Sequence, residues 1–207
     1  MTFPDFRFES TLWQDGCQFV AGVDEVGRGA LAGPVVTAAV VFPPNLNPKL
    51  LMGINDSKLL TAQKRNHLVP MIYQHALFYS LATIPVKTIN RLGITNATFK
   101  SMRTSIQQIN SCDHVLVDGF RIPFLKNLKH SQTAIVKGDR ISLSIAAASI
   151  LAKVHRDQLM TDLHQSLPHF HWKENKGYGT LTHRQAIKNH GASPHHRTLF
   201  IRKILSG

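Results

Sequence analysis

The chain has 207 residues, enough to bury a sizeable core, and its 24 Lys+Arg against 12 Asp+Glu give a formal net charge of +12. This balance favours a polyanionic partner, nucleic acid ahead of a membrane surface. The longest apolar stretch, residues 35–42, is too short to span a bilayer, the first six residues lack the regions of a signal peptide, and Cys17 and Cys112 form no C-x-x-C motif. We therefore expect a soluble, cytoplasmic protein with no membrane partner.

Strand signals come first along the chain. Residues 19–24 and 34–42 are apolar and rich in β-branched side chains, and a glycine-rich turn separates them, so they predict two neighbouring strands. Residues 45–58 contain proline, glycine and an Asn-Asp-Ser turn signal, and predict a loop. Thr61 is expected to cap a helix that ends at about residue 75.

The middle of the chain combines strand and helix patterns. Residues 77–84 predict a third strand, and residues 90–109 predict one helix with a buried apolar face. Residues 114–118 are apolar up to Asp118, as expected for a central strand that is buried on both faces. Residues 133–136 predict a further short strand.

A long helix is expected next, opened by Ser142 or Ser144 and ending near residue 163. Its alanine-rich first half favours close packing on a sheet. The tail is expected to form loops and one or two short helices. Strands followed by alternating strands and helices are typical of a mixed sheet flanked by helices. We predict an α/β fold with a five-stranded mixed sheet in one domain, residues 1–207, with about 165–207 as a C-terminal helical and loop extension.

Four carboxylates share one local pattern: each ends or follows a short apolar strand near a glycine. They are Asp24, Glu25, Asp118 and Asp139. Neighbouring side chains on a regular strand point to opposite faces, so Asp24 and Glu25 converge only where the backbone becomes irregular, which the following Gly-Arg-Gly turn permits. Each acid alone is more often a turn or capping residue. In a chain so poor in acids, the four together predict a site for Mg²⁺ or Mn²⁺, which prefer hard oxygen ligands.

Other polar residues allow two interpretations. Ser149 and Lys153 share a helix face and suit either a phosphate or a plain solvated surface. Asp157 lies one turn beyond Lys153 and is expected to be its ion-pair partner. Lys58 belongs either to a simple turn or to a phosphate contact. The twelve histidines show no zinc spacing, and we expect them to face solvent or phosphate.

The ordered set of motifs resembles bacterial ribonuclease HII, the type 2 ribonuclease H. The motifs are Asp24-Glu25-Val26-Gly27-Arg28-Gly29, Asn55-Asp56-Ser57-Lys58, Val117-Asp118-Gly119, Lys137-Gly138-Asp139, Ser144 to Asp157 and Lys176-Gly177-Tyr178-Gly179. They extend from about residue 20 to residue 197. The sister ribonuclease HIII family lacks the Gly-Arg-Gly element. Leu59 is a departure, because the family commonly has a second lysine there, and it bears on backbone affinity, not on the chemistry.

The resemblance implies a ribonuclease H-like fold and endonucleolytic hydrolysis of the RNA strand in RNA–DNA hybrids. Asp24, Glu25, Asp118 and Asp139 would hold two Mg²⁺ or Mn²⁺ ions. One ion would lower the pKa of the attacking water, and the other would stabilise the leaving 3′ oxygen. No covalent nucleophile is required.

The resemblance also assigns substrate contacts. The turn Gly27, Arg28 and Gly29 would offer backbone groups to the 2′-hydroxyl, which distinguishes ribose from deoxyribose. Tyr178 would stack on the sugar past the junction. Lys58, Ser149 and Lys153 would bind phosphates. We therefore expect incision on the 5′ side of a single ribonucleotide in duplex DNA by a monomeric enzyme, leaving 3′-hydroxyl and 5′-phosphate ends.

Two other classes remain open at this point. Another two-metal nuclease of the same fold, such as a resolvase or transposase core, would cut a fully deoxy version of the substrate. A catalytically inactive hybrid-binding module would show no metal-dependent cleavage, although the complete set of four carboxylates argues against it.

Overall fold

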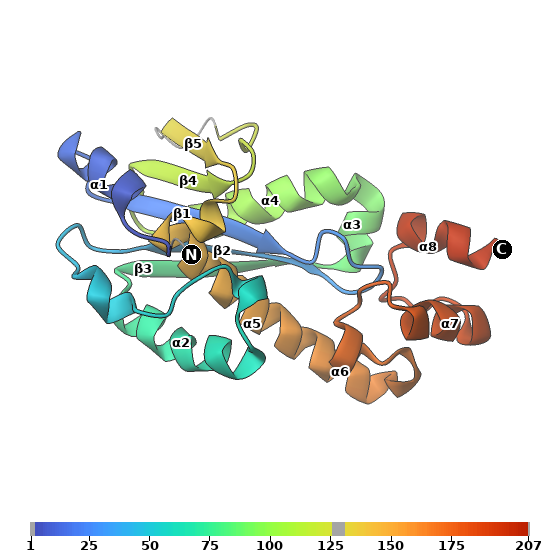
Figure 1. The fold of residues 1–207 in the computed structure, drawn as a ribbon. Coiled ribbons are helices and arrows are strands. Elements are labelled where there is room, and N and C mark those ends of the chain that lie inside the picture. The colour runs from blue at the N-terminus through green and yellow to red at the C-terminus, as the bar shows by residue number, and fades with distance from the viewer. Residues whose placement is uncertain (1–2, 126–130, 207) are drawn as a thin grey trace.

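A computed structural model describes residues 3–125 and 131–206, and within them five strands form one mixed sheet in the order β3-β2-β1-β4-β5 (Figure 1). The strands are β1 (Val20–Val26), β2 (Val35–Val41), β3 (Phe78–Ile84), β4 (His114–Asp118) and β5 (Ser131–Ile135). The first three strands pair antiparallel, whereas β4 pairs parallel with both β1 and β5. The predicted α/β architecture with a five-stranded mixed sheet is confirmed.

The register between β1 and β4 determines where the acids lie. Val23 is paired with Val117 in the parallel ladder, so Asp24 and Asp118 follow at the same end of adjacent strands. In open α/β sheets, ligands bind outside the carboxyl ends of the strands. The sheet therefore positions two acids where a ligand site is expected.

Helices cover both faces of the sheet (Figure 1). The long helix α5 (Leu143–Ser166) and α2 (Ala62–His75) pack on one face with alternate residues of β2. On the other face, α4 (Ile94–Gln107) packs against the intervening residues of β2 and against β1 and β4. Because β2 is buried on both faces, it is apolar along nearly its whole length.

The contact between α5 and β1 is unusually close because Gly22 has no side chain. A Cβ added at Gly22 would lie 2.2 Å from the carbonyl carbon of Ser144. Alanines on the first half of α5 extend this close packing, as predicted. Ser142, one of the two serines proposed to open the helix, is the N-cap, and its hydroxyl accepts a hydrogen bond from the Ile145 N–H.

Two expectations about helices were wrong, and one further helix was not anticipated. Residues 90–109 do not form one helix, because Gly93 adopts φ +76° and separates α3 (Val86–Leu92) from α4. An N-terminal helix, α1 (Arg7–Gln14), had not been predicted. The described tail contains three helices instead of one or two: α6 (Trp172–Asn175), α7 (Leu181–His190) and α8 (Thr198–Leu205).

Short 3₁₀ helices complete the structure. Two, η1 (Pro48–Leu51) and η2 (Ser57–Leu59), lie in or extend from the predicted loop 45–58, and η3 (Gly138–Arg140) links β5 to α5. Another, η4 (Pro168–Phe170), follows α5. Within the described residues, every helix is too short or too polar to cross a bilayer.

Candidate metal centre

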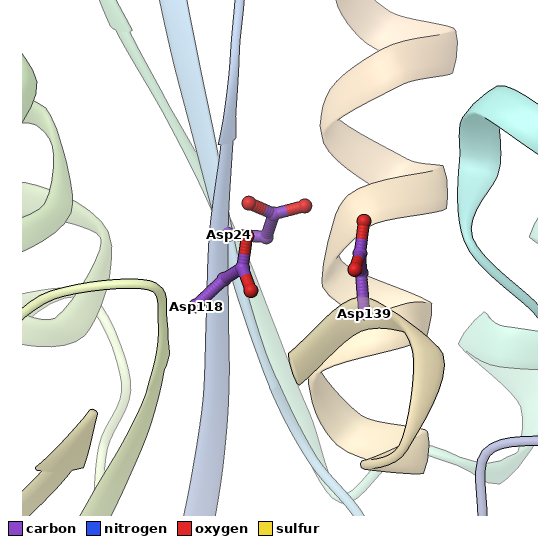
Figure 2. A group of neighbouring side chains, drawn as sticks. All are labelled: Asp24, Asp118 and Asp139. Atoms are coloured by element: carbon purple, nitrogen blue, oxygen red, sulfur yellow. The ribbon is translucent and has the colours of Figure 1, made fainter. Parts of the chain in front are cut away.

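Three of the four predicted acids converge on one point. Asp24 lies in β1 two residues before its end at Val26, and not at the strand end as predicted, whereas Asp118 ends β4 and Asp139 lies in η3. One carboxylate oxygen from each lies within 4.8 Å of the others. Figure 2 shows Asp24 and Asp118 reaching from the sheet toward the turn beside α5 that carries Asp139. We call these three residues the acid cluster.

The turn after β5 holds the acid cluster together. Lys137 adopts the left-handed conformation at φ +56°, which allows the chain to reverse from β5 into η3. Gly138 then donates its N–H to Oδ1 of Asp118 at 2.7 Å. A side chain at Gly138 would be crowded, because an added Cβ would lie 2.6 Å from Cδ1 of Ile145. Asp118 and the turn that bears Asp139 therefore form one hydrogen-bonded unit.

Glu25, the fourth predicted acid, lies beside the acid cluster and not in it. One of its oxygens is 3.5 Å from the Arg28 guanidinium, and the other is buried without a hydrogen-bond partner among the described residues. Glu25 borders a cavity of about 480 Å³. The cavity is lined by Glu25, Val26, Ser57, Lys58, Arg65, Ser149, Lys153 and Tyr178.

The carboxylates are held in an environment that disfavours their charge. Burial, followed by the charges of Glu25 and Asp118, raises the pKa of Asp24 well above its ordinary value, and a hydrogen bond from Ser149 opposes the rise. Burial raises the pKa of Glu25 to about 7, against the opposing effect of Arg28. Burial also raises the pKa of Asp118 and of Asp139. A cation bound at this point would offset both the cost of burying the negative charges and the repulsion between the carboxylates.

The donor set fits a hard divalent cation. The acid cluster offers carboxylate oxygens, and the unpartnered oxygen of Glu25 is a further donor nearby. Among the described residues, no other group of three or more His, Cys, Asp and Glu side chains has this geometry. Oxygen donors of this kind suit Mg²⁺ or Mn²⁺ better than Zn²⁺.

One lysine already contacts the acid cluster. The Lys58 ammonium lies 3.2 Å from Oδ2 of Asp139 and 3.7 Å from Oδ1 of Asp56, while its side chain remains 73% exposed. Asp56 is almost completely buried and also pairs with Arg140 at 3.2 Å. Asp56, interpreted from sequence only as part of a turn, therefore joins the loop of Lys58 to the turn of Asp139. Its partner Arg140 is too distant in sequence for a local pattern to reveal the contact.

The predicted phosphate residues on α5 have protein partners. The hydroxyls of Ser149 and Ser57 are 2.9 Å apart and buried. Lys153 donates to Asp157 at 2.7 Å, which is the expected ion pair. Both Ser149 and Lys153 line the cavity, and each already has a protein partner.

The two glycines of the Gly-Arg-Gly turn differ in their surroundings. Gly27 adopts φ +93°, and an added Cβ would lie 2.2 Å from Nε of Arg156. Gly29 is exposed, and no described atom would lie within 4 Å of its Cβ. Gly29 therefore leaves open space toward a ligand, as expected of both glycines, whereas Gly27 is required by packing inside the protein.

Two buried arginines, not anticipated from sequence, support this turn from behind. Arg156 donates to the carbonyls of Pro34, Lys176 and Ala32. Arg197 donates to the carbonyls of Gly33, Arg28 and Pro34. Neither side chain is exposed to solvent. Their partners are far away in sequence, so a local pattern could not identify these contacts.

Tyr178 is half-buried on the segment after α6 and lines the cavity. Its ring faces the Arg156 guanidinium, with Cζ 5.5 Å from the ring centroid. Its carbonyl accepts a hydrogen bond from Nδ1 of His183 at 2.9 Å, and Nε2 of the same histidine accepts one from Trp172 at 3.1 Å. The buried interior of the tail thus fixes the backbone at Tyr178.

Comparison with known proteins gives consistent results. Residues 21–203 match the family model described as ribonuclease HII. The chain is 47% identical over 197 residues to the ribonuclease HII of Synechococcus sp. strain JA-3-3Ab, covering 95% of this chain and 88% of that protein. It is similar to the crystal structure of ribonuclease H2 from Pyrococcus horikoshii OT3, with TM-score 0.70, 24% identity, and coverage of 91% and 97%. It is also similar to Bst-RNase HIII in complex with Mn²⁺, with TM-score 0.71, 17% identity, and coverage of 91% and 69%.

Proposed function

Because the chain belongs to the ribonuclease HII family and is thus an endoribonuclease with a ribonuclease H-like fold, we propose that it acts on two related substrates. The first is an RNA–DNA hybrid, in which it hydrolyses the RNA strand. The second is duplex DNA with one embedded ribonucleotide, which it incises on the 5′ side. Both reactions leave 3′-hydroxyl and 5′-phosphate ends. The observation that carries the proposal is the acid cluster within 4.8 Å, beside the cavity lined by Tyr178.

The acid cluster and Glu25 would hold divalent Mg²⁺ or Mn²⁺. Bound at these carboxylates, the ions supply a water of lowered pKa and neutralise charge on the phosphate and the leaving 3′ oxygen. The protein's contribution is orientation: Gly138 fixes Asp118, and Lys58 contacts Asp139 from the solvent side. The Mn²⁺ complex of the related Bst-RNase HIII supports a divalent ion in this fold.

The Gly-Arg-Gly turn would recognise the ribose. A 2′-hydroxyl is the only chemical mark of a lone ribonucleotide, so the groups that read it must approach the sugar closely. The open space at Gly29 supports such an approach. Arg197 donates to the Arg28 carbonyl at 2.9 Å and supports the turn from within.

Residues around the cavity would bind the rest of the strand. Lys58, Ser149 and Lys153 would contact phosphates, in keeping with the net charge of +12. Tyr178 would stack on the sugar past the junction, where a second 2′-hydroxyl would be crowded. We propose that the chain works as a monomeric catalytic domain whose segment 165–207 supplies Tyr178.

The proposal is tested with three labelled duplexes of one sequence: DNA with a single ribonucleotide, all-deoxy DNA, and a uniform RNA–DNA hybrid. We expect Mg²⁺- or Mn²⁺-dependent cleavage of the first and third, abolished by chelator, with the cut mapped to the 5′ side of the lone ribonucleotide. Cleavage of the all-deoxy duplex would instead indicate a DNA nuclease of the same fold. Hybrid binding without cleavage would indicate an inactive binding module.

A further inference from the structure

One buried side chain connects the two elements that would read the ribonucleotide junction. Arg156 lies on α5 with no exposed surface. Its Nε and Nη2 donate to the carbonyls of Pro34 and Ala32 at 2.9 and 3.0 Å, in the segment that follows the Gly-Arg-Gly turn. Its Nη1 donates to the Lys176 carbonyl at 2.8 Å, two residues before Tyr178. The guanidinium therefore bridges segments that are distant in sequence.

Besides donating these hydrogen bonds, the Arg156 side chain packs directly against Gly27 and Tyr178. On one side, the space that a Cβ of Gly27 would occupy is filled by Arg156, whose Nε would lie only 2.2 Å from it. On the other side, Cζ of Arg156 lies 5.5 Å from the centroid of the Tyr178 ring. The N–H groups of Leu31 and Ala32 also donate to the Gly177 carbonyl, so the backbones of the two segments are already joined. Arg156 adds a side chain that contacts both the Gly27 turn and the Tyr178 ring.

An arginine is suited to this position for a specific reason. Its planar guanidinium presents donors in a rigid fork, so three carbonyls from two segments are bound in one fixed geometry. Displacement of either segment would leave a buried donor or carbonyl unpaired, which is costly. A lysine has a flexible stem and a point-like ammonium, and cannot reproduce the fork.

We propose that Arg156 is a positioning residue that fixes Tyr178 relative to the Gly27 turn and thereby sets the preference for a single ribonucleotide over a uniform hybrid. This inference rests on the proposed function, in which the turn reads the 2′-hydroxyl and Tyr178 reads the sugar past it. A uniform hybrid offers a 2′-hydroxyl at every position and tolerates a small change in their spacing. A lone ribonucleotide offers a single 2′-hydroxyl, so the distance between the Gly27 turn and Tyr178 decides whether it is cleaved.

Arg197 provides a matched control. It is equally buried, and it also donates three ways to backbone carbonyls, those of Gly33, Pro34 and Arg28. All of its acceptors lie in the segment of the glycine turn, and its guanidinium faces Phe200 instead of Tyr178. Replacing Arg197 therefore loosens the turn without disconnecting it from Tyr178.

The test compares Arg156→Lys with Arg197→Lys in a competition assay, in which both substrates are present in one reaction. The ratio of their kcat/KM values is then independent of the fraction of folded enzyme. We expect Arg156→Lys to reduce the ratio of lone-ribonucleotide to uniform-hybrid cleavage by about tenfold. We expect Arg197→Lys to lower both activities in parallel. Arg156→Gln, which keeps a planar donor, provides a second variant.

A double-mutant cycle separates positioning from general loss of structure. In the wild-type background, Tyr178→Ala should reduce the ratio. In the Arg156→Lys background, the same substitution should have little further effect, because Arg156 acts through Tyr178. An unchanged ratio in both Arg156 variants, or an equal fall in Arg197→Lys, would overturn the inference alone. Failure of the wild-type enzyme to cut the lone ribonucleotide would overturn the proposed function and this inference with it.

Discussion

Oδ1 of Asp118 accepts a hydrogen bond from the N–H of Gly138 at 2.7 Å, so the carboxylate that ends β4 is held by the residue immediately before Asp139. An asparagine at position 118 can accept the same hydrogen bond with its side-chain oxygen. The structural role and the proposed metal-binding role of this side chain are therefore separable by one substitution.

Asp118→Asn should keep the fold and the affinity for hybrid while it removes cleavage. The amide retains the contact with Gly138 but offers a neutral, weak ligand in place of a carboxylate. Thermal unfolding, a binding titration and single-turnover cleavage in Mg²⁺ measure the three properties. Cleavage near the wild-type rate would show that the metal site is elsewhere.

Stabilisation by divalent ions should increase with pH. The folded-state pKa of Glu25, at about 7, lies above its ordinary value of 4.5, so without metal the stability that this group contributes below pH 4.5 is lost as the pH rises through 7. A bound cation removes this penalty by favouring the carboxylate. The rise in Tm on adding Mg²⁺ or Mn²⁺ should therefore be larger at about pH 8 than at about pH 5.5. Equal shifts at both pH values would contradict the prediction.

Lys58→Ala and Lys153→Ala should each weaken hybrid binding and flatten its salt dependence by about one unit of slope. Each phosphate contact releases condensed counterions when the complex forms, so a variant that lacks one contact releases fewer counterions on binding. Lys100, exposed on α4 across the sheet from α5, supplies the control, because Lys100→Ala should leave the slope unchanged. Slopes that match wild type in both cavity variants would show that neither lysine contacts a phosphate.

Tyr178→Ala should lose much more activity on a lone ribonucleotide than on a uniform hybrid. The aromatic face, not the hydroxyl, is the expected contact, so Tyr178→Phe should retain most of the preference. The two kcat/KM values and the Tm of each variant are the measurements. Small and equal losses on both substrates would identify Tyr178 as a packing residue.

Glu9→Gln should flatten the pH dependence of stability. Burial raises the pKa of Glu9, although Ser142 and Ser144 oppose the rise by donating to Oε1. The folded state therefore binds this proton more tightly than the unfolded state, and the stability that Glu9 contributes is lost as the pH rises from 4.5 through its raised folded-state pKa. The glutamine carries no such proton. Urea unfolding at several pH values should show that the free energy of unfolding of the variant increases relative to that of wild type as the pH rises. A difference that does not change with pH would contradict a raised pKa for Glu9.

The sequence predicted the features that depend on local pattern. Asp24 and Asp118 each come after an apolar run in a predicted strand, and parallel pairing brings these positions of β1 and β4 together, so their convergence was foreseeable. The break at Gly93 was missed because the apolar spacing continues across it, and an isolated glycine is tolerated in a helix. The roles of Asp56 and Arg156 were missed because their partners lie far along the chain. Such contacts follow from tertiary packing, which single-sequence patterns do not reveal.

The acid cluster draws its members from positions 24, 118 and 139, and β1 pairs in parallel with a strand that the ribosome makes much later. Parallel pairing of distant segments forms slowly, because the intervening chain must first lose its freedom. A growing polypeptide that ends before η3 lacks one of the three acids altogether. The three acids can therefore come together only after residue 139 has been made and β1 has paired with β4.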